Sequence, residues 1–304
     1  MARRRPRGRD ISGIVLLDKP LGMTSNAALQ RVKRLFNANK AGHTGSLDPL
    51  ASGLLPICLG EATKISSYLL DSDKAYSGTC KLGVTTTTAD AEGEILEQKP
   101  VAEYSPQQIT DVLAKFTGTI EQIPPMHSAI KQGGQPLYKL AHQGIEVERQ
   151  ARTIHIHELR AIRLEGDELE IDIRCSKGTY VRTLAEDIGR ELGCGAHLNR
   201  LRRTKVGPFM LDSAIELEAL EQLAEQGFEE LDRQILPIEE ALADWPEVQL
   251  TENSAFYLCR GQAIQVPQAP TGGLVRLSAN QRFLGIGEIL DDGRVAPKRL
   301  LKSG

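Results

Sequence analysis

Residues 42–64 read GHTGSLDPLASGLLPICLGEATK and carry an acid, Asp48, directly before a proline. Glycines at positions 42, 45, 53 and 60 argue against a helix interior or the middle of a regular strand, so the segment is predicted to be a shaped loop. The aliphatic side chains around the acid are Leu47, Leu50, Leu54, Leu55, Ile57 and Leu59. A carboxylate among apolar neighbours costs desolvation energy unless a partner or a function compensates. Asp48 is therefore either a turn cap or a functional group.

The bulk composition is that of an ordinary globular protein. The chain has 304 residues, of which 40% are hydrophobic and 25% charged, enough for one large domain and a small one. Its apolar runs are too short to span a membrane or to form a secretory signal. The five cysteines are scattered without CxxC spacing. This pattern predicts reduced thiols in the cytoplasm and no zinc site.

The charge is unevenly distributed along the chain. The formal net charge is −3, yet residues 212–244 hold 11 acids and one base, so the remainder carries +7. Basic residues cluster at 2–9, 200–205 and 294–302. A segregated basic surface is what a polyanionic partner such as RNA requires.

Periodicity predicts the main elements. We expect strands at 14–17, 74–82 and 168–175, and helices at 26–36, 63–70, 105–116 and from Val181 to a stop at Gly193. Tyr76 then points the same way as Cys80 and Leu82, toward a core. Arg182 lies where a turn gives way to a helix, and it needs an anion or a path to water.

The second half of the chain suggests an insertion and a further domain. Prolines, glycines and bases across 123–154 predict an exposed excursion, and long excursions tend to be functional. Acidic helices are expected over 212–244. A composition change near Trp245 then introduces short strand-like pieces, which predict a small β domain.

These pieces together resemble one family. GHTGSLDPLASGLL, KAYSG, CSKGTYVRTLAEDIG, LRR and the terminal GIGEI and RVAPKRLL closely resemble the TruB family of pseudouridine synthases, which convert uridine 55 in the T loop of tRNA to pseudouridine. The resemblance covers nearly the whole chain, and its first motif is long and specific. It implies an α+β catalytic domain on a twisted, mostly antiparallel mixed sheet with surrounding helices, followed by a β-rich, PUA-like domain.

The resemblance also implies residue roles. Asp48 is expected to be the catalytic aspartate, Arg182 its ion-pair partner, and Tyr76 the ring that packs on the flipped uracil. His43 is expected to enter the RNA loop and Leu201 to complete the pocket. The full set of expected substrate-binding residues is His43, Tyr76, Tyr180, Arg182 and Leu201, and that of RNA-binding residues is Lys19, Lys64, Lys131, Arg149, Arg202 and Arg203.

The expected organisation has three parts. Residues 1–10 form a basic flexible tail, 11–245 the catalytic domain with an RNA-clamping insertion at about 124–152, and 246–304 the PUA-like domain. The enzyme is expected to act on the tRNA T arm as a monomer, without cofactor, metal, guide RNA or obligate protein partner.

Three alternatives remain open, the first of them drawn from the family resemblance. A guide-RNA-dependent pseudouridine synthase shares the aspartate motif but lacks most of the insertion. A glycosidase requires a second carboxylic acid near the first, for which Asp90 is the candidate. A non-catalytic RNA-binding or tRNA-folding protein retains its effect on RNA without Asp48.

Overall fold

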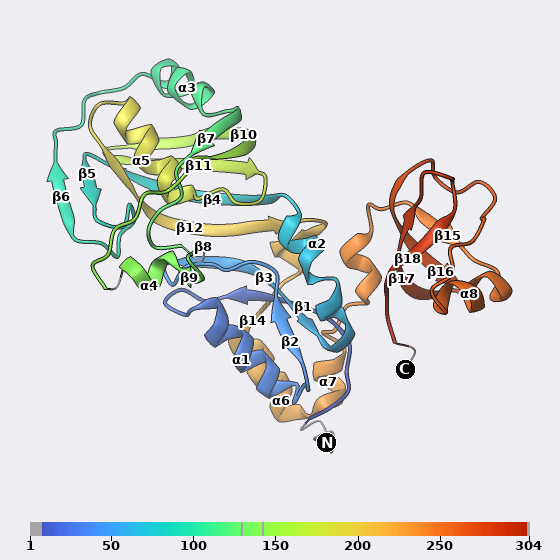
Figure 1. The fold of residues 1–304 in the computed structure, drawn as a ribbon. Helices are drawn as coiled ribbons and strands as arrows, with labels where there is room; N and C mark the ends of the chain where they lie inside the picture. Colours follow the sequence, from blue (N-terminus) through green and yellow to red (C-terminus); the bar gives the residue numbers. More distant parts are fainter. Residues whose placement is uncertain (1–7, 129, 142, 303–304) are drawn as a thin grey trace.

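A computed structural model describes residues 8–128, 130–141 and 143–302. Within these residues a large mixed sheet forms the main body, and a four-stranded sheet forms a separate C-terminal lobe (Figure 1). None of the helices in this part of the chain combines the length and the apolar character needed to cross a membrane.

The large sheet is mixed but mostly antiparallel. Its members are β1 (Gly13–Lys19), β2 (Ala41–His43), β3 (Ala51–Leu59), β4 (Lys74–Leu82), β7 (Gly118–Gln122), β10 (Arg152–Glu165), β11 (Glu168–Cys175), β12 (Ala196–Val206), β13 (Phe209–Met210) and β14 (Ile215–Glu216). Their order is β14-β1-β3-β12-β4-β11-β10-β7, with β2 beside β3 and β13 beside β12. Only the β1–β14 and β3–β12 pairings are parallel. The predicted fold class is confirmed.

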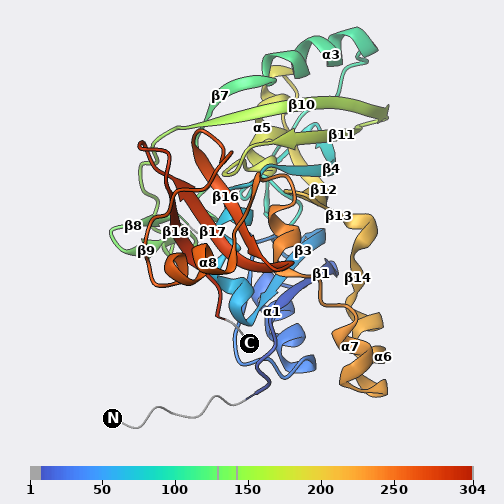
Figure 2. The ribbon, with the colours of Figure 1, turned by 90° about the vertical axis from the view of Figure 1, so that its right-hand side faces the viewer.

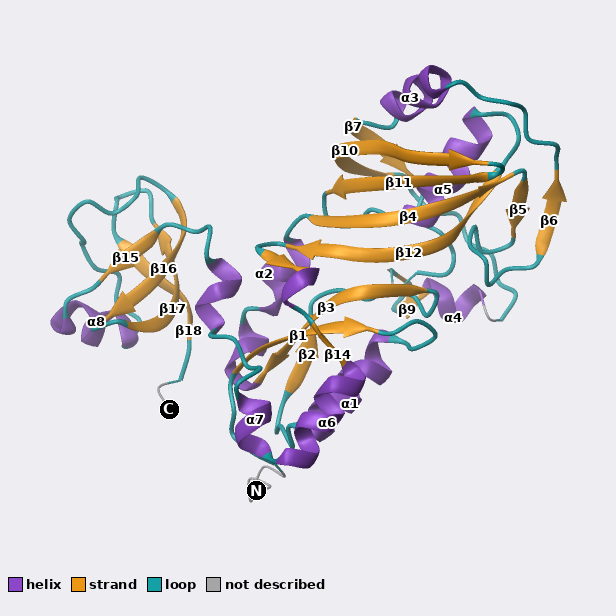
Figure 3. Ribbon diagram, turned by 180° about the vertical axis from the view of Figure 1, so that it is seen from behind, coloured by secondary structure: helices purple, strands orange, loops and turns teal. Residues whose placement is uncertain are grey.

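The described part of the main body contains both α-helices and short 3-10 helices. They are α1 (Ser25–Leu35), η1 (Gly60–Lys64), α2 (Ser66–Asp71), α3 (Pro106–Lys115), α4 (Leu137–Ala141), α5 (Val181–Glu191), η2 (Leu211–Ser213), α6 (Leu217–Gln226), α7 (Phe228–Asp232) and η3 (Ile238–Leu242). Helices α3 and α5 share a core with β4, β10, β11 and β12. Seen from behind, these strands lie in front of α5 (Figure 3), so the helix packs on one face of this half of the sheet.

Strand β1 is buried on both faces, which explains its unbroken apolar run. Val15 and Leu17 pack in a core with α1, α6 and α7, whereas Ile14 and Leu16 pack in a second core with η1, α2 and η3. A strand covered on both sides reads as a continuous hydrophobic run instead of an alternating one.

Strand β3 departs from the sequence prediction. Asp48 lies in a loop as expected, but the glycine- and proline-containing stretch behind it is a regular central strand. Pro56 fits because β3 pairs with β12 through residues 51–53 and with β2 through residues 57–59, leaving a gap between them on that edge. The Pro56 carbonyl accepts a bond from Thr44 Oγ1 at 3.5 Å in this gap. The local rule against proline in central strands is overridden by this break in pairing.

Other predicted elements match closely or are divided. Strands β4 and β11 have the predicted bounds. Helix α3 begins at Pro106 with Ser105 as its N-cap in a capping box with Gln108. The helix expected over 63–70 is instead the short pair η1 and α2. The hairpin of β5 (Val84–Thr86) and β6 (Ile95–Gln98) was not foreseen.

The described part of the predicted tail, residues 8–10, is attached to the main body. Residues 1–7 lie outside the described ranges, but residues 8–10 do not behave as a free tail. Arg9 donates to Asp232 Oδ1 at 3.0 Å, lies 4.2 Å from the centre of the Phe228 ring, and pairs through its backbone with Ala38. These contacts fix this end of the described chain to α7 and to the segment after α1.

The C-terminal lobe has its own sheet and core. It contains β15 (Glu247–Gln249), α8 (Glu252–Cys259), β16 (Gly273–Ala279), β17 (Arg282–Ile289) and β18 (Val295–Leu300), with the strands in sequence order. It lies to one side of the large sheet (Figures 1 and 2). Helix α8 was not expected in this β-rich part.

Two sets of contacts dock the lobe on η1 and α2. Ile286 of β17 is buried in the same core as Ile65 and Leu69, and the Trp245 and Tyr68 rings meet edge-to-face at 5.1 Å. In addition, Lys64 Nζ donates to the Leu300 carbonyl at 3.1 Å. Removing the lobe would therefore expose apolar surface of the main body.

Gly53 provides a test of the close pairing between β3 and β12. It has φ +102°, and a Cβ there would lie 2.4 Å from the Arg203 carbonyl oxygen. Gly53→Ala is expected to lower the free energy of unfolding by about 3 kcal/mol, because backbone strain and a clash with main chain add. Gly166→Ala, with φ +60° and open space around it, is the matched control and should cost only about 1 kcal/mol. Equal losses in urea unfolding would show that the close approach to β12 is not the limiting feature.

Candidate active site

The Asp48 loop is held by the turn that leads from β1 into α1. Ser25, the first residue of α1, accepts from Leu47 N at 2.7 Å and donates to the Leu47 carbonyl at 3.0 Å. Gly22 N donates to the Pro49 carbonyl at 2.8 Å. These bonds bracket Asp48 on both sides, so the direction of its carboxylate is set by the main chain.

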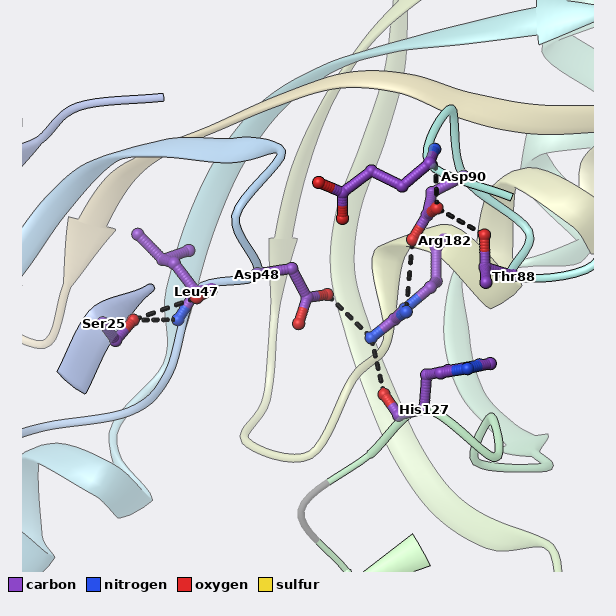
Figure 4. A network of polar contacts seen from close by, with 8 residues as sticks. Ser25, Leu47, Asp48, Thr88, Asp90, His127 and Arg182 are labelled. Carbon is purple, nitrogen blue, oxygen red and sulfur yellow. Dashed lines mark hydrogen bonds and ion pairs between the residues drawn. The ribbon is translucent and has the colours of Figure 1, made fainter. Parts of the chain in front are cut away.

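Arg182 connects two carboxylates at the floor of a cleft (Figure 4). Its Nη2 lies 2.7 Å from Asp48 Oδ2, and its Nη1 lies 3.2 Å from Asp90 Oδ2. Nη2 also donates to the His127 carbonyl at 2.8 Å. Side-chain exposure is 46% for Asp48, 7% for Arg182 and 2% for Asp90. Asp48 is thus the member of the cluster that a ligand can reach, and the predicted Asp48–Arg182 ion pair is confirmed.

Asp90 is oriented by the turn that carries it. Its Oδ1 accepts from Thr88 Oγ1 at 2.5 Å and from Glu92 N at 3.1 Å, which leaves Oδ2 directed at Arg182. Because every oxygen of this buried group has a donor, the charge is tolerated. Asp90 is a structural partner of Arg182 with almost no exposure, and this geometry does not suit the acid that a glycosidase would require.

The cleft has a volume of about 790 Å³ and is lined by Asp48 and by all five predicted substrate-binding residues: His43, Tyr76, Tyr180, Arg182 and Leu201. They come from β2, the β2–β3 loop, β4, the start of α5 and β12. Tyr138 of the insertion also lines it. A concave site with apolar walls and a few convergent polar groups is the usual form of a ligand site.

The cleft changes the protonation of its groups. Desolvation raises the pKa of Asp48 above its ordinary value of 3.8, and the Arg182 guanidinium opposes this rise while Asp90 adds to it. Desolvation also lowers the pKa of His43, helped by Arg203. His43 Nδ1 is buried without a hydrogen-bond partner in this structure. A neutral imidazole and an arginine-supported carboxylate therefore face the same space.

Tyr76 and Leu201 form the apolar part of the floor. Both are half-buried and pack against the core beneath α5. Leu201 pairs with Ala51 on one side and Gly78 on the other. Desolvation raises the pKa of Tyr76, so the ring is a neutral platform. A planar base could lie on it.

Two predicted RNA-binding residues are buried, which contradicts that assignment. Lys19 is 0% exposed, donates to the carbonyls of Pro20 and Met23 at 2.8 and 2.6 Å, and has its pKa lowered by desolvation to about 8. Arg203 is 1% exposed and donates to the carbonyls of Leu54 and Gly45. Both side chains are thus engaged with main-chain carbonyls within the protein, and neither is presented at the outer surface, although Arg203 also contributes to the lining of the cleft.

The other predicted RNA-binding residues lie outside the cleft lining. Lys131 is exposed on the hairpin of β8 (Lys131–Gln132) and β9 (Gln135–Pro136). Arg202 is half-exposed and forms a two-bond pair with Asp18. Arg149 bonds the Pro124 carbonyl at 3.3 Å and so joins the two ends of the insertion. Lys64 pairs with Glu61 and docks the C-terminal lobe. Of these, Lys131 is the side chain best presented to a phosphate.

The residues described here do not suggest a metal centre. Within 8–128, 130–141 and 143–302, no three His, Cys, Asp or Glu side chains gather in a way that could hold a metal ion. Among the groups that line the cleft are the Asp48 carboxylate, the Arg182 guanidinium and the Tyr76 ring.

Comparisons with known proteins give one family. The family model for the N-terminal domain of TruB family pseudouridylate synthase matches residues 33–181. The tRNA pseudouridylate synthase B C-terminal domain matches 182–243, and the C-terminal part of pseudouridine synthase II TruB matches 246–301.

Relatives and solved structures agree with these matches. The chain is 58% identical to tRNA pseudouridine synthase B of Stutzerimonas stutzeri over 97% of both chains, and 57% identical to that of Nitrosococcus oceani over 99% of this chain and 98% of the relative. A crystal structure of a Cbf5-Nop10-Gar1 complex matches with a TM-score of 0.74 and 26% identity over 96% of this chain and 84% of the other. An H/ACA RNP bound to a substrate RNA containing 2′-deoxyuridine shares the fold, with a TM-score of 0.75, at 24% identity over 96% of this chain and 85% of the other. The chain belongs to the TruB family of pseudouridylate synthases.

Proposed function

We propose that this protein isomerises uridine 55 in the T loop of tRNA to pseudouridine, with Asp48 as the catalytic carboxylate. The observation that carries the proposal is the exposed face of Asp48 against buried Arg182 at 2.7 Å, in the cleft of a TruB family chain. The closely similar relatives are tRNA pseudouridine synthases by name, which favours tRNA as the substrate and the cytoplasm as the place of action.

The reaction requires few groups. The N1–C1′ glycosidic bond breaks, the uracil turns, and a C5–C1′ bond forms, while N1 gains a proton and C5 loses one. No oxidant, reductant or group carrier enters this balance. Asp48 can act by attack on the sugar, by attack on the base, or by removal of a sugar proton that leads to a glycal. All three routes begin from the ionised carboxylate, so Arg182 has the same role in each.

The target uridine must leave its stack to reach Asp48, at a cost of roughly a few kcal/mol. Tyr76 offers a ring on which the uracil can stack, and Leu201 an apolar edge beside it. His43, neutral and half-buried at the cleft wall, is placed to fill space that the extruded nucleotide leaves. Tyr180, the N-cap residue of α5, lines the same space.

The insertion is proposed to hold the T arm. It carries exposed Lys131 and Lys139 on β8 and α4, and Tyr138 between them lines the cleft. Bases would bind phosphates and fix the register of the RNA. With such an insertion the enzyme is proposed to work alone, as a monomer, whereas a guide-dependent enzyme would depend on partners.

The C-terminal lobe is proposed to be an auxiliary PUA-like RNA-binding domain. Arg260 lies 3.3 Å over the exposed Phe256 ring of α8, and Arg282 and Arg299 are exposed on β17 and β18. Because the lobe shares a core with the main body, its contribution is best tested by charge substitutions on its surface rather than by truncation.

Asp48→Asn tests the catalytic role. The amide keeps the shape but removes the charge, so pseudouridine formation in a T-arm stem-loop should fall below detection. Binding of the RNA should change by less than about tenfold, or 1.4 kcal/mol, because the residues proposed to bind phosphates lie elsewhere. Mass mapping of the RNA measures the product, and intact mass of the protein excludes deamidation back to Asp. Appreciable product from the Asp48→Asn variant with its amide intact would overturn the assignment.

Arg182→Lys tests the guanidinium geometry. Lysine keeps the positive charge but cannot reach Asp48, Asp90 and the His127 carbonyl together. The single-turnover rate at saturating RNA should therefore fall at least about tenfold, equivalent to 1.4 kcal/mol. Arg190→Lys, on the exposed side of α5, serves as the control. A rate equal to that of the parent would show that charge alone is sufficient.

Replacement of Gln132–Glu148 by a short Gly/Ser linker tests the insertion. Its side chains are largely exposed, so the melting temperature should barely shift while binding to the T-arm stem-loop weakens severely. The purified parent protein should convert one uridine in this RNA with no cofactor, metal or guide added. If the parent is inert until a cell extract is supplied, the guide-dependent alternative replaces the self-sufficient enzyme.

A further inference from the structure

Gln122 is a buried polar residue that the reaction does not use directly. It is the last residue of β7 and is only 3% exposed. Its amide makes two hydrogen bonds, both to the main chain of Tyr180: Nε2 donates to the Tyr180 carbonyl at 3.1 Å, and Oε1 accepts from Tyr180 N at 2.8 Å. The pairing resembles one rung of a sheet made by a side chain.

The two segments that this amide joins have different tasks. Gln122 lies directly before the insertion, whereas Tyr180 is the N-cap residue of α5 and has no side-chain cap bond of its own. Arg182 follows two residues later. The Tyr180 carbonyl also accepts the first intrahelical bond, from Leu184 N at 3.1 Å. The start of α5 is therefore fixed from outside the helix by Gln122.

A second bond connects the same two segments. Arg182 Nη2 donates to the carbonyl of His127, five residues along the insertion from Gln122. The root of the insertion and the first turn of α5 thus share one bond pair through Gln122 and one bond through Arg182. A shift of the insertion root would be transmitted to the guanidinium that contacts Asp48.

We propose that Gln122 is a positioning residue, which ties the root of the RNA-clamping insertion to the first turn of α5 and so sets Arg182 against Asp48. The inference rests on the proposed function for its link to catalysis. Its structural part, the dependence of the Arg182–Asp48 contact on the Gln122 amide, can be measured without RNA. The residue acts through Tyr180 and Arg182 and does not itself line the cleft.

Gln122→Met is the main variant, because it keeps the length and volume of the side chain and removes both hydrogen bonds. At a temperature well below unfolding, the single-turnover rate at saturating T-arm stem-loop should fall at least tenfold, while the Kd for this RNA changes less than threefold. Gln98→Met, exposed on β6, is the control and should match the parent in both. An unchanged rate, or a rate loss no larger than the unfolded fraction, would overturn the proposal.

A titration of Asp48 separates this inference from the proposed function. The Arg182 guanidinium lowers the pKa of Asp48, so a loosened Arg182 should let that pKa rise in Gln122→Met, as followed by carboxyl-carbon NMR of the free protein. Charged neighbours of position 122 are Arg152, directly opposite on β10, and Arg182 with Asp48 beyond Tyr180; the variant alters none of them. An unshifted Asp48 pKa would overturn the coupling even in an active enzyme. If the parent protein forms no pseudouridine but the Asp48 pKa still rises in the Gln122→Met variant, the result counts against the proposed function alone.

Discussion

A carboxylate in a concave, partly dry cleft keeps its charge only when a cation lies beside it, and Arg182 is that cation for Asp48. The same guanidinium also neutralises Asp90, so one positive charge is shared by two negative ones. The buried ammonium of Lys19 adds a second attraction toward Asp48. Removing one partner of such a cluster leaves an uncompensated charge. This destabilises a protein far more than replacing the whole cluster by apolar residues. Arg182 therefore links the segments that carry Asp48, Asp90 and His127.

The sheet meets the requirement by bringing four segments to one place. Asp48 comes from the loop before β3, Arg182 from the start of α5, Asp90 from the β5–β6 turn, and the His127 carbonyl from the insertion. Strand β3 can carry its loop to the centre because its pairing changes from β12 to β2 along one edge. The interruption admits Pro56 and leaves the Leu54 carbonyl to be satisfied by Arg203.

Sequence reasoning succeeded where one local motif holds the information. Asp48 and Arg182 each lie in a long, specific stretch, and β4, β11 and α3 follow from alternation and capping. It failed where the answer depends on distant neighbours. Lys19 and Arg203 were expected to bind RNA from the family resemblance, yet both belong to central strands and are buried. One local signal was present for Lys19, which lies two residues after the apolar run 14–17 and directly before a proline.

Asp90 and Gln122 show a second kind of limit. Each makes its important bond to a residue more than fifty positions away, at Arg182 and Tyr180 respectively. Their own surroundings in the sequence, a polar turn and a strand end, describe ordinary structural residues.

The parts proposed to contact RNA are attached to the same elements that build the catalytic cluster. The insertion is rooted on Tyr180 and Arg182, and the C-terminal lobe docks on η1 and α2, which directly follow β3. Neither is joined to the main body by a free linker in the described residues. RNA held by both would therefore be positioned relative to the β2–β3 loop and α5, the two segments that carry Asp48 and Arg182. Because reacting groups must be placed to within a fraction of an ångström, rigid attachment of this kind favours one uridine over its neighbours.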